Sequence, residues 1–265
     1  MSRFTLGIVG AGNMATAILN GILKSGCLNP DEIIVSDVDG DKLEAISEKG
    51  VVVTFDNELI FGQSDYILLA VKPQVAKEVF KDIKYKNLKV ISIMAGISRN
   101  TVSEMFGGAR VARIMPNTPC LVGKGMCAVD AGDFDEDGRK LVSVIFSSLG
   151  KIVELDEKYF DAVTAVSGSG PAYVYTFIKA MIDEGVALGL DEKISETLTL
   201  QTFKGAVKMV EERTTDVDTL IKNVCSKGGT TIEAVNCFAE NNLDKIIAEG
   251  MKRCEKRSKE LSGNV

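Results

Sequence analysis

The pattern of apolar and polar residues divides the 265-residue chain into two parts. In the first part, short apolar runs alternate with stretches in which apolar residues recur every three or four positions. Such alternation predicts parallel strands joined by helices that cover both faces of one sheet. The expected strands span residues 6–9, 33–37, 51–53, 65–71, 90–93, 111–115, 126–129 and 150–154, and the expected helices span 14–25, 43–49, 74–83 and 135–148.

The pattern changes near residue 160, where helical spacing takes over and almost no strand-like alternation remains. Helices are expected at residues 172–188, 195–212, 216–224, 231–239 and 243–261. We therefore predict one domain over residues 1–159 and an all-α domain over residues 160–265.

A glycine-rich motif follows the first expected strand. Gly10, Gly12 and Ala15 match the G-x-G-x-x-A fingerprint, which combines a tight turn, a close approach to pyrophosphate and close helix packing. A tight turn in an unrelated α/β protein, or a site for S-adenosylmethionine, would give the same triplet. The strand before the motif and the helix after it favour a dinucleotide. The predicted fold class is therefore α/β, with an N-terminal Rossmann-type dinucleotide-binding domain.

The second expected strand ends in an acidic residue, Asp37, about 20 residues beyond the glycine motif, where NAD-binding folds place a partner for the ribose 2′-hydroxyl. Asp37 also belongs to an acidic cluster with Asp39 and Asp41 that is typical of a turn and a helix cap. Ser36 and Lys42 are alternative contacts for a 2′-phosphate, so the choice between NADH and NADPH stays open at this point.

Several loops are expected to ring one crevice, because ligands bind beyond the carboxyl ends of parallel strands. These loops contain Asp37 and the pairs 72–73, 95–96 and 116–117. A second glycine turn, at residues 226–231, precedes an expected helix, and its successive N–H groups suit a carboxylate. The alternative is an ordinary helix cap by Thr230 or Thr231. The segment 167–170 before Pro171 allows the same two interpretations, a ligand approach or a plain helix start.

Composition narrows the function classes. Apolar residues make up 45% and charged residues 26% of the chain, as in ordinary globular proteins. The net charge of −6 gives no support for binding to nucleic acid or to an anionic membrane, and no apolar stretch has the length of a membrane span. The N-terminus shows no signal-peptide pattern, so a cytoplasmic location is expected.

The chain contains no histidine, and its six cysteines form no C-x-x-C pair. A histidine general base, a Ser-His-Asp triad and a histidine-ligated metal are therefore excluded. No metal site is predicted, and the cysteines are expected to be reduced core residues. Any catalysis must proceed without an imidazole.

Five motifs in order indicate a known family: V-G-A-G-N-M at 9–14, A-V-K-P at 70–73, M-P-N-T-P at 115–119, V-S-G-S-G-P-A-Y at 166–173 and G-G-T-T-I-E-A at 228–234. With them the chain resembles the pyrroline-5-carboxylate reductases over nearly its full length. The resemblance implies that the all-α C-terminal domain mediates dimerisation and interleaves with a partner subunit, and that self-association gives a dimer or a higher oligomer such as a decamer. It also implies reduction of the C=N bond of 1-pyrroline-5-carboxylate to L-proline by NADPH or NADH, the last step of proline biosynthesis.

The resemblance also implies site residues. The cofactor-binding residues would be Gly10, Ala11, Gly12, Asn13, Met14, Ser36, Asn57, Ala70, Val71, Lys72, Pro73, Ala95 and Gly96, to which its spacing adds Asp37. The substrate-binding residues would be Ser226, Gly228, Gly229, Thr230 and Thr231. Because a cyclic imine is basic enough to take up a proton itself, we assign Thr231 as the catalytic hydroxyl donor to the ring nitrogen and the N–H groups of Gly229 and Thr230 to the carboxylate.

The chain departs from the family at three positions. Lys227 stands where members usually have proline, Met94 stands where a small residue is common, and Asp37 lacks the neighbouring arginine of NADP-preferring relatives.

Two other function classes fit parts of the sequence. A 3-hydroxyacid dehydrogenase or a broader imine reductase has a similar layout, and Lys179 is a candidate for the lysine that the hydroxyacid enzymes use. A regulatory protein that senses a dinucleotide without turnover explains the first glycine loop but not the turn at 228–231.

Overall fold

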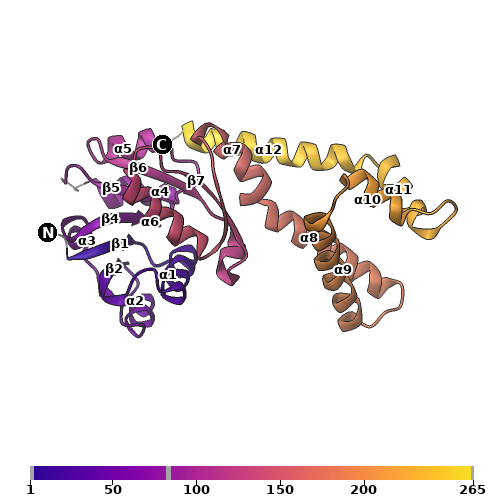
Figure 1. Cartoon of the computed structure of the whole chain (residues 1–265), viewed down its shortest axis with the longest axis horizontal. Helices are drawn as coiled ribbons and strands as arrows, with labels where there is room; N and C mark the ends of the chain where they lie inside the picture. The colour runs from indigo at the N-terminus through magenta and orange to yellow at the C-terminus, as the bar shows by residue number, and fades with distance from the viewer. Residues whose placement is uncertain (1–2, 82–84, 264–265) are drawn as a thin grey trace. The chain divides into compact units, whose positions relative to one another are not determined.

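The structure is a computed structural model that describes residues 3–81 and 85–263. Within these ranges the chain forms two compact units, and Figure 1 labels most of their helices and strands. The sheet unit comprises Met1–Ser169 together with Cys254–Val265, and the helical unit comprises Gly170–Arg253.

The sheet unit is built on one sheet with the strand order β3-β2-β1-β4-β5-β6-β7-β8. In the register of the central strand, Leu6 lies opposite Ile33 on one side and Tyr66 on the other. The order of the first six strands is that of the Rossmann fold, which confirms the predicted class of this part. The strands are β1 (Phe4–Val9), β2 (Ile33–Ser36), β3 (Val52–Thr54), β4 (Ser64–Leu69), β5 (Lys89–Ser92), β6 (Arg110–Met115), β7 (Gly125–Asp130) and β8 (Gly150–Glu154).

Helices cover both faces of the sheet because the central strands are apolar on both faces (Figure 1). On β1, Leu6 and Ile8 belong to one core cluster, whereas Phe4 and Val9 belong to the other. The first cluster includes residues of α1 (Asn13–Ser25), α2 (Gly40–Ser47) and α6 (Glu136–Ser147). The second includes residues of α3 (Asn57–Gln63), α4 (Pro73–Phe80) and α5 (Arg99–Met105).

The strands lie where the sequence predicts them, with ends shifted by no more than about two residues. The last two strands differ in direction from the all-parallel expectation, since β7 runs antiparallel to β6 and β8 runs parallel to β7. Residues 116–124 join β6 to β7, and this connection is too short for the helical crossover that parallel neighbours need.

Two helices of the sheet unit, α3 and α5, were not expected from the sequence. Each spans only seven residues, which is too short to show a repeating apolar pattern, although Ile60 and Phe61 of α3 and Val102 of α5 are buried. The expected helix 74–83 is observed as α4, and residues 82 and 83 lie outside the described residues. Short helical segments complete the unit: η1 (Pro30–Glu32), η2 (Thr118–Val122), η3 (Glu157–Tyr159), α7 (Phe160–Val163) and the π-helix η4 (Thr164–Gly168).

The remaining helices, at the positions expected from sequence, are α8 (Gly170–Ala187), α9 (Glu192–Glu212), α10 (Val217–Val224), α11 (Thr230–Glu240) and α12 (Leu243–Gly263). Helices α8 and α9 approach closely at Gly185, where an added Cβ would lie 2.1 Å from Ser195 Oγ. Ser195 Oγ donates to the Ile182 carbonyl at 2.9 Å.

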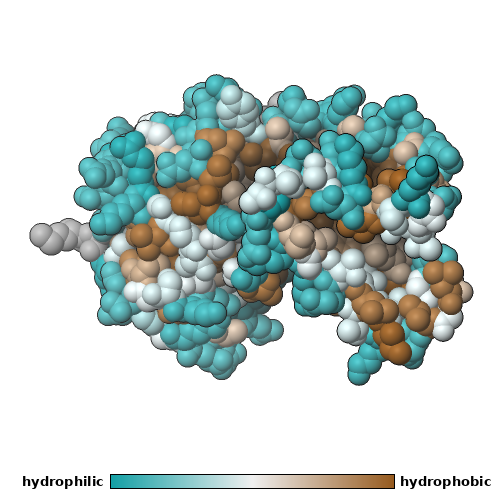
Figure 2. Space-filling view, turned by 45° about the vertical axis from the view of Figure 1, so that its right-hand side comes forward, coloured by the Kyte–Doolittle hydropathy of each residue, from teal (hydrophilic) through white to brown (hydrophobic). Residues whose placement is uncertain are grey.

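The helical unit exposes many apolar side chains. None of the residues of α8, α10 and α11 is buried, and Tyr175, Met209 and Phe238 are each more than half exposed. Figure 2 shows hydrophobic residues open to solvent on this unit. A surface of this kind marks an interaction site. No described helix has the length and apolar character needed to cross a membrane.

Candidate functional site

The glycine-rich loop follows β1, and its first glycine is required by the backbone itself. Gly10 has a φ of 100°, and a Cβ there would lie 2.9 Å from the Ala70 carbonyl oxygen. Its N–H donates to the Ser36 carbonyl at 2.8 Å. Gly10 therefore brings the ends of β1, β2 and β4 together.

The second glycine has no such role within the protein. Gly12 is the N-cap of α1 with φ −71° and ψ 176°, and a Cβ there would meet no atom within 4 Å. The first N–H groups of α1 have no acceptor within the helix, and its first turn carries no acidic side chain. The missing side chain leaves an open approach to a positively polarised helix end, which fits the diphosphate of a dinucleotide.

Three predicted cofactor residues gather beside this loop at the end of β2. Asp37 Oδ2 accepts a hydrogen bond from the Ala11 N–H at 2.5 Å, and Asp37 Oδ1 accepts one from the Asp39 N–H at 2.9 Å. The buried Ser36 hydroxyl donates to Asn57 Oδ1 at 2.7 Å, and Asn57 begins α3. Asp37 is thus both a turn carboxylate and a neighbour of the glycine loop.

The other predicted cofactor residues follow the next two strands. The Ala70 N–H donates to the Val9 carbonyl at 2.9 Å, and the exposed Lys72 is the N-cap residue of α4. After β5, the Ser92 hydroxyl accepts from the Met94 N–H at 3.3 Å, and Gly96 has a φ of 73°. Because β4 and β5 are parallel neighbours, their following loops lie at the same edge of the sheet.

The turn after β6 is held by an amide side chain. Asn117 Oδ1 accepts from the Met126 N–H at 2.9 Å, and its Nδ2 donates to the Ser167 carbonyl at 3.0 Å. At Gly168 a Cβ would lie 2.7 Å from Met115 Cε, whereas at Gly170, the first residue of α8, it would meet no atom within 4 Å. Packing against Met115 therefore explains the first of these glycines.

The second glycine turn lies within the helical unit, between α10 and α11. The Gly229 N–H donates to the Ser226 carbonyl at 3.0 Å, and Gly228 has a φ of 71° while Lys227 has no positive φ. These features define a type II turn, in which the position of Lys227 is one that proline favours. Gly229 also packs on Ser226, since a Cβ there would lie 2.4 Å from Ser226 Oγ.

The N-terminal cap of α11 is not the threonine cap that the sequence offered as an alternative. Gly229 is the N-cap residue, and neither Thr230 nor Thr231 caps the helix through its side chain. The Gly229 N–H is used inside the turn, so its expected contact with a carboxylate would compete with an internal hydrogen bond. The N–H groups at the start of α11 have no acceptor within the helix. Thr231 is half-buried and lines an apolar hollow of about 430 Å³ within this unit.

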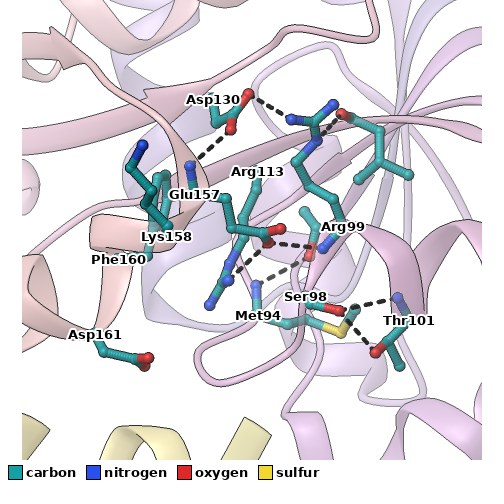
Figure 3. A network of polar contacts seen from close by, with 12 residues as sticks. Met94, Ser98, Arg99, Thr101, Arg113, Asp130, Glu157, Lys158, Phe160 and Asp161 are labelled. Carbon is teal, nitrogen blue, oxygen red and sulfur yellow. Dashed lines mark hydrogen bonds and ion pairs between the residues drawn. The ribbon is translucent and has the colours of Figure 1, made fainter.

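Sequence reasoning missed a partly buried polar network in the sheet unit, shown in Figure 3. Glu157 Oε1 accepts from Arg113 Nη1 and from the Arg99 N–H, both at 2.7 Å. Arg99 also donates to Asp130 Oδ1 at 2.7 Å and to the Val111 carbonyl at 3.1 Å. Arg113 is only 6% exposed in the structure. The one signal for this in the sequence is an arginine inside the apolar strand β6, because a buried charge needs a partner.

The two arginines of this network are each paired with at least one carboxylate. Burial by itself lowers the pKa of the Arg99 guanidinium, but its contacts with Asp133 and Asp130 outweigh burial and raise it. The hollow of about 610 Å³ beside these residues is also lined by Asp156, Lys158 and Asp161. We interpret the network as a structural connection between α5, β6, β7 and η3. Within residues 3–81 and 85–263, no group of three His, Cys, Asp or Glu side chains is placed to hold a metal ion.

The strand order and the glycine loop define a dinucleotide-binding domain of the Rossmann class. Residues 5–96 match the family model "NADP oxidoreductase coenzyme F420-dependent", and residues 157–261 match "Pyrroline-5-carboxylate reductase dimerisation". Pyrroline-5-carboxylate reductase of Arabidopsis thaliana is 37% identical, covering 98% of this chain and 96% of its own length. The Synechocystis enzyme of the same name is 38% identical, with 97% of each chain covered. The chain belongs to the pyrroline-5-carboxylate reductase family.

A solved structure agrees with this assignment. Pyrroline carboxylate reductase of Plasmodium falciparum, crystallised with NADP bound, superposes with a TM-score of 0.89 and is 33% identical, and 99% of each chain is covered.

Proposed function

We propose that this chain reduces the C=N bond of 1-pyrroline-5-carboxylate to L-proline with NADPH or NADH, as the last step of proline biosynthesis. The similarity to named reductases along 98% of the chain carries the proposal. The open approach at Gly12 supports it, because the chain has a place for the diphosphate of the hydride donor.

We assign dinucleotide binding to the domain 1–159, through the cofactor-binding residues given above. We assign dimerisation and substrate binding to the domain 160–265, with Ser226, Gly228, Gly229, Thr230 and Thr231 binding the imino acid. The free N–H groups at the start of α11 support a carboxylate contact there.

The chemistry fits a protein without histidine. A nicotinamide supplies the hydride when bound, and the chain's own residues orient the reactants, which accounts for much of the rate in such reactions. A cyclic imine takes up its proton readily, so the protein needs only a hydroxyl donor near the ring nitrogen. Thr231 has that role in our proposal.

The test is to mix the purified protein with pyrroline-5-carboxylate and follow the absorbance of NADH and of NADPH. Oxidation of either one, with proline formed in equal amount, is the expected result. Tight dinucleotide binding without any oxidation would contradict the proposal and favour a dinucleotide-sensing protein. Turnover of a 3-hydroxyacid instead would favour the dehydrogenase alternative and direct attention to Lys179.

Removing the hydroxyl of Thr231 should slow the reaction. We expect Thr231→Ala to lower kcat/KM, with a loss of transition-state stabilisation of about 1–3 kcal/mol. The reason is that the ring nitrogen would lose a half-buried hydroxyl donor. Thr231→Ser keeps the hydroxyl and serves as the matched control. Wild-type kinetics in the alanine variant would remove Thr231 from the mechanism.

We also propose that the exposed apolar faces of the helical unit are covered by a second copy of the chain, and that dimers assemble further, for example into a decamer. The match to a dimerisation model over residues 157–261 supports self-association. Light scattering should give a multiple of the 28.5 kDa chain mass. A monomer at micromolar concentration would contradict this proposal. A cytoplasmic location, expected from the sequence, stays a proposal as well.

A further inference from the structure

We propose that Asp37 makes this chain prefer NADH to NADPH. The proposal rests on the dinucleotide binding proposed above and adds to it the identity of the cofactor. Three observations at the end of β2 carry it.

The first observation is that the Asp37 carboxylate is fixed in place. One oxygen accepts from the Ala11 N–H at 2.5 Å and the other from the Asp39 N–H at 2.9 Å, so both oxygens are held beside the glycine loop. Each carboxylate oxygen can accept more than one hydrogen bond. In Rossmann folds the adenosine ribose lies next to an acidic residue at this position. Asp37 can therefore accept from a ribose 2′-hydroxyl without giving up its own contacts.

The second observation is that the nearest basic side chain in the sequence is already paired. Lys42 Nζ lies 2.9 Å from Asp39 Oδ2, and this hydrogen bond is the main reason that the pKa of the Lys42 ammonium is raised. Residues 37–42 hold the three acids Asp37, Asp39 and Asp41 against this one base. The segment is therefore negative, and a 2′-phosphate would bring about two further negative charges to it.

The third observation concerns Ser36, the other candidate contact for a 2′-phosphate. Its hydroxyl is buried and donates to Asn57 Oδ1 at 2.7 Å. Because a hydroxyl has one proton, Ser36 cannot donate to a phosphate while this bond persists. Both contacts that the sequence offered for NADPH are thus engaged elsewhere, whereas the contact offered for NADH is fixed and available.

The experiment measures binding rather than turnover. Dissociation constants for NADH and NADPH are determined by isothermal titration calorimetry on the wild-type protein, without imine substrate. We expect NADH to bind about tenfold more tightly or better, since one fixed carboxylate close to a phosphate costs at least that much near a protein surface. Equal or tighter binding of NADPH would overturn the proposal.

A variant pair assigns the preference to its residue. Asp37→Asn keeps the size of the side chain and removes its charge. The dissociation constant for NADPH divided by that for NADH should therefore fall toward one. Asp41→Asn makes the same change of net charge at an exposed position of the same segment and should leave the ratio largely unchanged. If both variants shift the ratio equally, the general charge of the segment, and not Asp37, sets the preference. Because no substrate is present, these outcomes are independent of whether pyrroline-5-carboxylate is reduced.

Discussion

Replacing Gly12 with aspartate should abolish dinucleotide binding and leave the fold intact. A Cβ at this position meets no protein atom within 4 Å, and its backbone conformation suits any residue. Aspartate is also a favoured N-cap, so the free energy of unfolding should change by no more than about 0.5 kcal/mol. The new carboxylate would lie where we place the diphosphate, and repulsion between the two should cost several kcal/mol, or roughly a hundredfold or more in Kd.

Calorimetric titration with NADH, together with thermal unfolding of the same samples, measures both effects. Gly12→Ala is the matched control, because it adds a methyl group without charge and should weaken binding less. An aspartate variant that binds NADH as the wild type does would show that the diphosphate lies elsewhere.

Replacing Glu157 with alanine should lower the stability of the sheet unit by about 3 kcal/mol. Glu157 is the shared acceptor for the Arg113 guanidinium and the Arg99 N–H, both at 2.7 Å. Arg113 would then remain in the interior with a charge that has lost its 2.7 Å carboxylate partner, although it keeps its position over the Phe160 ring. Removing one partner of an ion pair that is shielded from solvent lowers the stability by more than the pair itself contributes, because the other charge stays in the interior without compensation.

Urea unfolding followed by circular dichroism gives the midpoint and slope for this comparison. Glu154→Ala removes an exposed glutamate from β8 and makes the same change in net charge. Its midpoint should stay close to that of the wild type. Equal midpoints for both variants would mean that the network contributes little to stability.

Much of the sheet unit could be predicted because its strands are buried on both faces and so appear as continuous apolar runs. Leu6, Ile8 and Val9 are each at most 2% exposed and mark β1 without ambiguity. Helix α5 could not be predicted in this way, since Val102 and Met105 are its two apolar residues and its start depends on capping by Ser98. Local capping signals of this kind occur in many loops as well.

The candidate site also has a part that the sequence predicts and a part that it does not. The glycine loop was predictable because its residues act through local backbone conformation, as the positive φ of Gly10 shows. The contact between Asp37 and Ala11 spans 26 residues, and that between Glu157 and Arg113 spans 44. Such pairings depend on strand order and direction, and a single sequence does not reveal which charged residues become neighbours.

The return of residues 254–263 to the sheet unit has a consequence for biosynthesis. Ser258 Oγ donates to Asp161 Oδ1 at 2.6 Å, and Cys254 Sγ lies 3.2 Å from Ser169 Oγ. A ribosome translates all of Gly170–Arg253 before it reaches these contacts. The nascent sheet unit must therefore wait, with the surface around Asp161 uncovered, until the helical unit has been made, which exposes this surface to chaperones during translation.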